Sequence, residues 1–290
     1  MELFQYPYMQ RALLAALIIG LAAPSLGIYL VQRRLTLIGD GIGHVALTGV
    51  GLGLLLNRSP VLVAVLVAAA GAVAVELIRA RGRTSGDLAL ALLFYGGIAG
   101  GVMLVGLSNS NSAKLNAYLF GSLTTIPPED MIVIVGLGVA ILVAMLALRP
   151  ALFAVCHDEE YARVSGLPVR TLNLLIAVTT AVTVTIAMRA VGVLLISALM
   201  VVPVAAAQQV ARGFRSTMAA AMLIGLLAAG SGIWVAANAN TAPGASVVLM
   251  AIAAFVVVAT FGAVWRGLRR RSAPATTPAS EPHEVVLNRS

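Results

Sequence analysis

Long apolar runs of about 20 residues alternate with short polar segments along the whole chain. An α-helix rises about 1.5 Å per residue, so about 20 residues cross the roughly 30 Å hydrocarbon core of a bilayer. Each run is continuously apolar rather than alternating, which favours helices over the strands of a membrane β-barrel. The pattern therefore predicts an all-α polytopic membrane protein with about nine transmembrane helices. The predicted spans are residues 9–31, 35–56, 60–78, 88–107, 131–148, 172–188, 191–210, 218–237 and 245–264.

Basic residues between the runs predict how these helices are oriented. Cytoplasmic loops of membrane proteins are enriched in Lys and Arg. With the N-terminus outside and the C-terminus in the cytoplasm, fifteen of the nineteen basic residues face the cytoplasm. The four that remain outside are Arg11, Arg58, Lys114 and Arg189. We therefore expect a multi-pass protein of the cell membrane with an external N-terminus and a cytoplasmic C-terminus.

The bulk composition agrees with residence in a lipid bilayer. The chain is 60% hydrophobic and 10% charged, with a mean hydropathy of +0.99. Such a chain has too little polar surface to cover a soluble core. The net charge of +8 comes from basic residues at the ends of spans, so we expect no nucleic-acid partner. Cys156 is the only cysteine, which excludes an intrachain disulfide and a thiolate metal cluster.

Two segments do not fit the pattern of spans. Residues 117–123 are apolar but too few to cross a bilayer, and we expect them on the membrane surface or in a re-entrant helix. From Ser272 the composition shifts to Pro, Ser, Thr and charged residues, which bury too little apolar area to fold. The chain is thus predicted to form a transmembrane domain over residues 1–271 and a disordered cytoplasmic tail over residues 272–290.

The predicted span 35–56 carries two ionisable residues four positions apart, Asp40 and His44. An Asp at the centre of a span costs about 2.5–3.5 kcal/mol on insertion scales, so two such groups on one helix indicate a function. Positions i and i+4 lie on one helix face, one turn apart. A carboxylate and an imidazole so placed suit Zn²⁺ or Mn²⁺, and they also suit a proton relay. The structural alternative is that Asp40 caps the helix while His44 binds a nearby carbonyl.

A second candidate site lies in the polar segment between the fifth and sixth predicted spans. Residues 158–168 are predicted to form a short helix, in which Asp158 caps the N-terminus and Glu159 and Glu160 suit the positive end of the helix dipole. Gly166 ends the helix. A helix of two turns is not stable alone, so it is either a solvated connector or a knob that docks into a partner protein. The residues predicted to dock are Asp158, Glu159, Glu160, Tyr161, Arg163 and Gly166.

The chain carries no motif of an ATPase or of an intramembrane hydrolase. A G-x-x-x-x-G-K-[ST] phosphate loop is absent, and the one lysine, Lys114, lies on the predicted outer side. An aspartyl protease needs two facing carboxylates, and a zinc metalloprotease needs an H-E-x-x-H motif. The predicted spans offer neither. We therefore predict a transporter subunit that is not an enzyme, and any ATP that drives it is hydrolysed by a separate chain.

Three blocks of sequence resemble one family of membrane proteins. They are RRLTLIGDGIGHVALTGV at residues 33–50, DEEYARVSGLP at 158–168 and VGVLLISALMVVPVAAA at 191–207. The blocks resemble, in type and order, those of the membrane permease subunit of ATP-binding-cassette (ABC) importers for zinc, manganese and iron. The likeness covers residues 11–266 and leaves out only the tail.

This resemblance implies a function, partners and roles for the two candidate sites. It implies a homodimer of permeases in the lipid bilayer, two cytosolic ATPase subunits and an extracytoplasmic metal-binding protein. Asp40 and His44 would contact the metal, and residues 158–168 would be the helix that contacts the ATPase. No covalently bound cofactor is expected, because Zn²⁺ or Mn²⁺ is the transported substrate.

Two questions about transport stay open at this point. A site with a histidine favours zinc slightly over manganese. The alternative to an ABC importer is a proton-coupled secondary metal transporter, which would use Asp40 and His44 as a relay and would not need the short helix.

Overall fold

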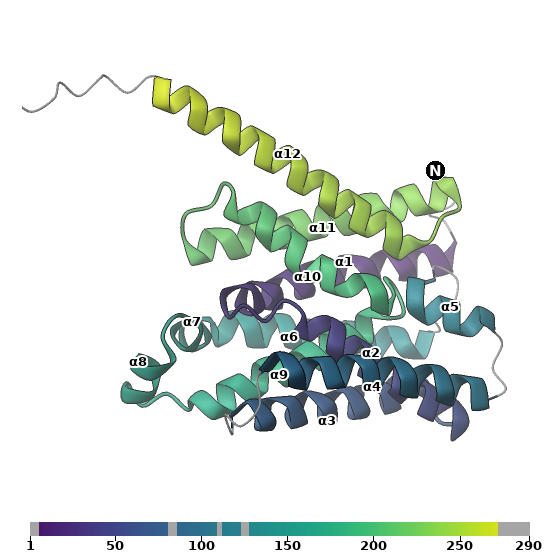
Figure 1. The fold of residues 1–290 in the computed structure, drawn as a ribbon. Helices are drawn as coiled ribbons and strands as arrows, with labels where there is room; N and C mark the ends of the chain where they lie inside the picture. The colour runs from purple at the N-terminus through teal and green to yellow at the C-terminus, as the bar shows by residue number, and fades with distance from the viewer. Residues whose placement is uncertain (1–5, 81–85, 109–111, 123–127, 272–290) are drawn as a thin grey trace, which may run out of the picture.

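The computed structural model describes residues 6–80, 86–108, 112–122 and 128–271 of the 290-residue chain. Within these ranges all regular structure is helical, which confirms the predicted fold class. The helices are α1 (Pro7–Gln32), α2 (Ile38–Leu55), α3 (Pro60–Ala80), α4 (Gly86–Leu107), α5 (Ser112–Phe120), α6 (Pro128–Ala147), α7 (Arg149–His157), α8 (Glu159–Val164), α9 (Val169–Ala187), α10 (Val193–Gln208), α11 (Phe214–Ala239) and α12 (Pro243–Arg271). Most of them run along one direction, with α7 and α8 at one end of the bundle and α5 at the other (Figure 1).

Eight of the described helices are long and apolar enough to cross a membrane, namely α1, α2, α3, α4, α6, α9, α11 and α12. They correspond to eight of the nine predicted runs. The remaining predicted run, residues 191–210, forms α10, which is apolar but has only 16 residues. Gly192 turns the chain just before α10 with a φ of +92°, so this helix begins later than predicted. The external position of the N-terminus stays a prediction.

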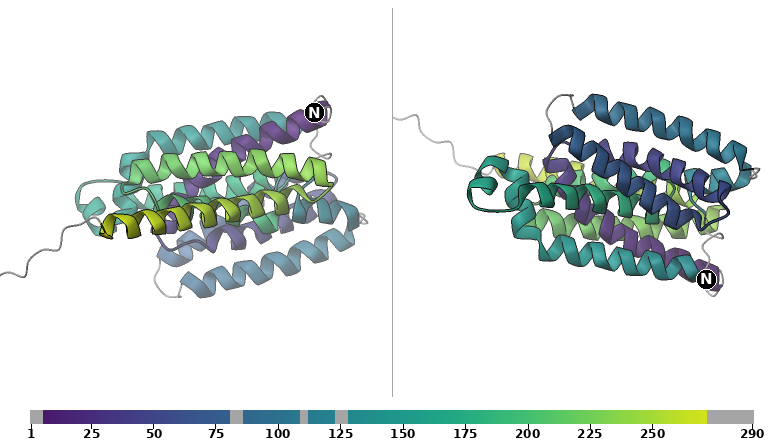
Figure 2. Two further views of the ribbon diagram at one scale, coloured as in Figure 1. Left: turned by 90° about the horizontal axis from the view of Figure 1, so that it is seen from above. Right: turned by 90° about the horizontal axis from the view of Figure 1, so that it is seen from below.

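Helices α1, α2 and α9 form the centre of the bundle. In their most apolar stretches 72%, 67% and 67% of the residues are buried, against 17% in α4 and 22% in α6. Helices α4 (blue) and α6 (teal) lie on opposite flanks (Figure 2). Helix α4 packs on α2 and α3, whereas α6 packs on α1 and α9. On α4 the exposed side chains include Leu92, Tyr95 and Met103, as expected for a helix that faces lipid.

Two short helices refine the sequence prediction at the two ends of the bundle. The apolar segment 117–123 was expected on the surface or re-entrant, and its first residues belong to α5, a nine-residue helix that contacts α10 and α12. At the opposite end α7 was not predicted. It buries Leu152 and Val155 against the bundle. Residues 123–127 and the predicted disordered tail, 272–290, lie outside the described residues.

Candidate functional site

Asp40 and His44 lie near the start of α2, on the helix face that their spacing predicts. Asp40 is in the first turn, where the positive end of the helix dipole favours a carboxylate. Its side chain is half-buried, and His44, one turn deeper, is 7% exposed. Both residues therefore belong to the interior of the bundle rather than to a solvated loop.

Asp40 does not cap α2, because no side chain caps this helix. Instead its Oδ1 accepts a hydrogen bond from the Oγ of Ser197 on α10. Ser197 is buried, and it lies beside Gly39 as well, where a methyl group would be 3.5 Å from its Cβ. Helix α10 therefore supplies, through Ser197, the hydrogen bond that holds the Asp40 carboxylate in place.

His44 packs edge-on against the ring of Phe94 on α4, with ring centroids 4.5 Å apart and an interplanar angle of 80°. The two helices come close here because Gly97 faces the backbone of His44. A methyl group at position 97 would lie 2.6 Å from the carbonyl carbon of His44. Thr48 adds a hydrogen bond from its Oγ1 to the carbonyl oxygen of Gly97, at 2.8 Å. These contacts fix the imidazole ring from α4.

The Nδ1 atom of His44 is buried and has no hydrogen-bond partner in the described part of the chain. Buried polar atoms are nearly always paired, so an unpaired one needs an explanation. The alternative in which this nitrogen binds a neighbouring carbonyl is not what the structure shows. A carboxylate and an imidazole nitrogen one helical turn apart are groups of the kind that bind divalent metal ions.

One copy of the chain does not complete a metal site around this pair. Over the described residues no group of three or more His, Cys, Asp or Glu side chains is close enough to hold a metal ion. Structural zinc sites have four protein ligands. Asp40 and His44 alone would offer two ligands, so a metal site here would need further ligands from backbone, hydroxyl groups, water or another chain.

The second candidate site, around α8, has the local structure that its sequence predicts. Asp158 caps the helix, since its Oδ1 accepts a hydrogen bond from the backbone N–H of Tyr161 at 2.9 Å. Glu159 and Glu160 occupy the first turn, and Gly166 follows the helix with a φ of +80°. Arg163 forms an ion pair with Glu159 at 3.4 Å.

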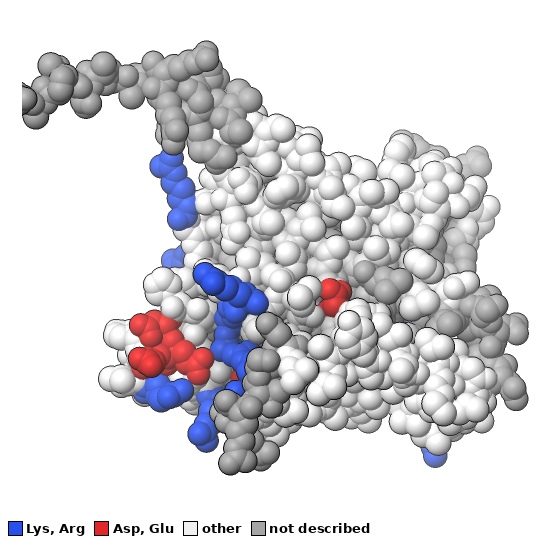
Figure 3. Space-filling view, in the orientation of Figure 1, with Lys and Arg blue, Asp and Glu red and all other residues white. Residues whose placement is uncertain are grey.

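The outer face of α8 exposes two apolar side chains between charged ones. Tyr161 is 67% exposed and Val164 is 88% exposed, whereas Ala162 is fully buried. Charged side chains gather at this end of the molecule, over α7, α8 and the neighbouring helix ends (Figure 3). The rest of the face in that view carries few charges. A helix that exposes an aromatic and a β-branched side chain among charged groups has the character of a docking element.

Sequence reasoning missed two residues that the structure places in these sites. Ser197 lies within the third sequence block but had no assigned role, although a serine inside an apolar span needs a partner. Arg33 opens the first block, and its guanidinium forms an ion pair with Glu159 of α8 at 3.2 Å. Only the folded chain shows these two partnerships.

The described helices form an apolar multi-pass membrane bundle with a short exposed helix at one end. Comparison with known proteins gives its class, the membrane permease subunit of an ABC importer, which is not itself the ATPase. The chain belongs to the ABC 3 transport family, whose model matches residues 5–262. The family prediction made from the three sequence blocks, a permease for divalent metal ions, is therefore confirmed.

Individual relatives agree with this assignment over nearly their whole length. The chain is 28% identical to the manganese transport system membrane protein MntC of Halalkalibacterium halodurans, covering 95% of this chain and 97% of the relative. It is 31% identical to the high-affinity zinc uptake system membrane protein ZnuB of Haemophilus influenzae, covering 85% and 94%. A solved structure, PsaBC from Streptococcus pneumoniae in complex with Fab, has a chain that is 28% identical, with a TM-score of 0.83 and coverage of 92% and 97%.

Proposed function

We propose that this permease passes zinc, and manganese less readily, from an extracytoplasmic binding protein into the cytoplasm, and that Asp40 and His44 contact the ion on its way. The observation that carries the proposal is the buried Nδ1 of His44, which has no partner among the described residues and lies one turn from Asp40. Carboxylate and imidazole ligands suit both ions, and the imidazole favours zinc.

A homodimer supplies the ligands that one chain lacks. If the two permeases are related by a twofold axis along the path, each contributes one Asp40 and one His44. Four ligands of this type match the number that tetrahedral zinc needs. The pair is then a waypoint in the path rather than a resting site of high affinity, because each chain alone holds the ion with only two groups.

The ATPase subunits dock on α8 in this proposal. Its exposed Tyr161 and Val164 offer an apolar contact, and Asp158 keeps the six-residue helix folded. The alternative of a proton-coupled secondary transporter has no use for α8 and does not agree with the family to which the chain belongs.

The test is uptake of radioactive zinc and manganese by cells that lack their own importers and express this permease with its ATPase and binding protein. We expect Asp40→Ala and His44→Ala each to reduce uptake to background, because each removes a ligand. Ser197→Ala should reduce uptake about tenfold, since the groups that orient metal ligands typically contribute 10–100-fold.

Glu76→Gln is the matched control. Glu76 is a carboxylate on α3 that is 8% exposed, paired with Arg79, and not part of the Asp40 and His44 pair. This variant should keep its uptake. Co-purification of the ATPase with every variant shows that the complex has assembled. Uptake that survives both alanine substitutions in assembled complexes would remove the pair from the mechanism.

A further inference from the structure

Arg33 joins three separate helices at the α8 end of the bundle. It directly follows the last residue of α1. Its Nη1 donates a hydrogen bond to Oδ1 of Asn173 on α9 at 2.7 Å, and its Nη2 donates to Oε2 of Glu159 on α8 at 3.2 Å. The Arg33 side chain is 7% exposed, so the ion pair is largely shielded from water on the arginine side. Charge-assisted hydrogen bonds of this type are the strong ones in proteins.

Arg33 is also close in sequence to Asp40 and His44. Arg34 has a φ of +58°, and the N–H of Leu35 donates to the carbonyl oxygen of Leu30 at 2.8 Å, which closes α1 with a tight left-handed turn. Helix α2 begins at Ile38, and Asp40 follows in its first turn. Because this turn is short, the chain between Arg33 and the start of α2 cannot lengthen much. A displacement of Arg33 therefore also displaces the start of α2.

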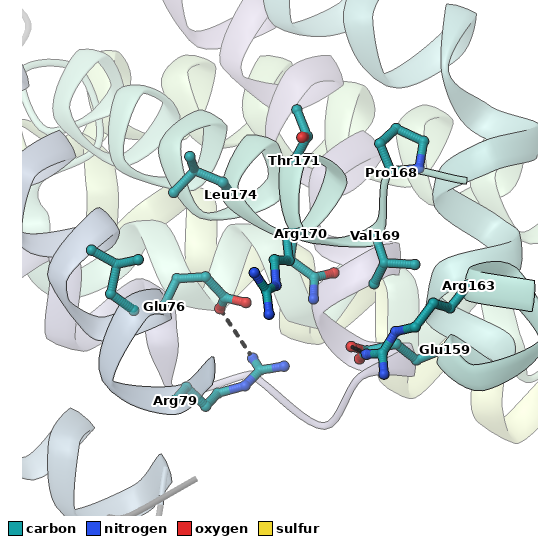
Figure 4. A pocket seen from close by; sticks show the side chains of 11 residues that line it. Glu76, Arg79, Glu159, Arg163, Pro168, Val169, Arg170, Thr171 and Leu174 are labelled. Carbon is teal, nitrogen blue, oxygen red and sulfur yellow. Dashed lines mark hydrogen bonds and ion pairs between the residues drawn. The ribbon is translucent and has the colours of Figure 1, made fainter. Parts of the chain in front are cut away.

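Helix α8 is otherwise held lightly. Its one buried residue is Ala162, and it packs mainly against α7 and less against α9. A cavity of about 980 Å³ lies beside it, between the ends of α3, α8 and α9. Figure 4 shows Glu159 and Arg163 on one side of this cavity and the Glu76–Arg79 pair on the other. The cavity leaves room for α8 to shift without breaking a packed core.

We propose that Arg33 is a positioning residue that transmits the displacement of α8 to the start of α2, and thereby to Asp40. This inference rests on the proposed function, in which the ATPase moves α8 and Asp40 contacts the ion. The planar fork of an arginine binds Glu159 and Asn173 at once, whereas a lysine ammonium offers a single point charge and does not reproduce this geometry. Asn173 orients the guanidinium towards Glu159, so that Arg33 stays bound to Glu159 when α8 moves.

The experiment reconstitutes the permease with its ATPase in proteoliposomes, adds the binding protein, and measures zinc uptake and ATP hydrolysis in the same sample. We expect Arg33→Met to keep ATP hydrolysis within about twofold of the parent while the zinc transported per ATP falls at least about tenfold, a loss equivalent to about 1.4 kcal/mol of coupling. Arg33→Lys should fall between the two. Arg170→Met is the matched control, because Arg170 is an exposed residue of α9 that lines the same cavity without an ion pair to α8. It should leave both quantities unchanged.

A charge exchange keeps the proposal testable if Arg33→Met does not assemble. Arg33→Glu and Glu159→Arg should each uncouple transport, and the double variant should recover several-fold of the zinc transported per ATP, because the ion pair is restored with reversed polarity. The proposal is overturned if Arg33→Met and Arg170→Met transport equally, or if the double variant is no better than the single ones. Failure of the proposed function gives another result: Asp40→Ala would then transport zinc normally, whether or not the Arg33 variants are uncoupled.

Discussion

The two ends of the bundle are built in opposite ways. At the α5 end, Gly192 meets the last turn of α5 so closely that a methyl group on it would lie 2.4 Å from the carbonyl oxygen of Leu119. Arg189 forms an ion pair with Asp130 at 3.0 Å and donates to the hydroxyl of Tyr118 at 3.1 Å. At the α8 end, a cavity of about 980 Å³ separates α8 from α3, and the ion pair between Arg33 and Glu159 links the end of α1 to α8.

This difference indicates that the α8 end is displaced more easily than the α5 end. Close backbone contacts and buried ion pairs resist small displacements, whereas a short helix beside a cavity moves with little loss of packing. In the proposed function the ATPase docks on the α8 end, which is the more easily displaced one. The proposed role of Arg33 is that a displacement imposed there reaches Asp40 through the α1–α2 turn, while the α5 end serves as the fixed frame.

The largest difference in stability between the two ends of the bundle is expected when a methyl group is added at each of them. Gly192 and Gly166 both have positive φ, but the methyl group clashes with backbone at Gly192 and meets nothing within 4 Å at Gly166. We expect Gly192→Ala to destabilise the protein by roughly 3 kcal/mol or more, from backbone strain plus overpacking. Gly166→Ala should cost about 1–2 kcal/mol, from strain alone. Thermal unfolding of the purified permease measures both, and equal losses would contradict the difference between the ends.

A smaller effect is expected from removing one arginine at each end. The Arg189–Asp130 pair is well shielded, with side chains 14% and 13% exposed, whereas the side chains of Arg163 and Glu159 on α8 are 68% and 40% exposed. Arg189→Met leaves Asp130 without its counter-ion and should cost about 2 kcal/mol, somewhat less than a fully buried pair. Arg163→Met should cost less than about 1 kcal/mol, because its ion pair is exposed to water. Unfolding midpoints compare the two variants, and a larger loss for Arg163→Met would reverse the assignment of the rigid end.

The smallest expected effect is on the rate at which Cys156 on α7 is labelled, and it leaves stability unchanged. Helix α7 is the helix against which α8 mainly packs. Burial raises the pKa of Cys156 from 9.0 to about 11, and the nearby Arg33 guanidinium opposes this only in part. Only the thiolate reacts, so near pH 8 Cys156 should be labelled by a thiol reagent about a hundredfold more slowly than an exposed cysteine. The rate should rise about tenfold per pH unit up to pH 11. Ser165→Cys, at the end of α8, provides the exposed reference on the Cys156→Ala background, and similar rates at the two positions would show that α7 opens as easily as α8.

Local features of the fold follow from the sequence, and long-range ones do not. The cap that Asp158 makes on α8 involves a residue three positions away, and residues 158–168 specify it completely. The spans follow from apolar runs because a helix that crosses a bilayer needs about 20 apolar residues. Helix α7 was missed because it is short and amphipathic, so its two buried residues give no run that stands out.

The partners within the sites lie far apart in the chain. Ser197 binds Asp40 across 157 positions, and Arg33 binds Glu159 across 126. No spacing rule connects residues at such separations, because helix packing decides which faces meet. The metal role of Asp40 and His44 stays a prediction from the sequence, whereas the contacts of Asp40 with Ser197 and of Arg33 with Glu159 emerge only from the packed bundle.

The most direct test of the metal role of His44 is to change the ligand rather than remove it. In His44→Cys a soft thiolate replaces the imidazole, and soft ligands favour zinc and cadmium over manganese. Uptake of zinc, cadmium and manganese, measured in competition in the same cells, should shift towards cadmium and zinc by at least about tenfold relative to manganese, since ligand type sets selectivity among divalent metals. If all three ions fall by the same factor, or if their ratios stay as in the parent, His44 does not contact the ion.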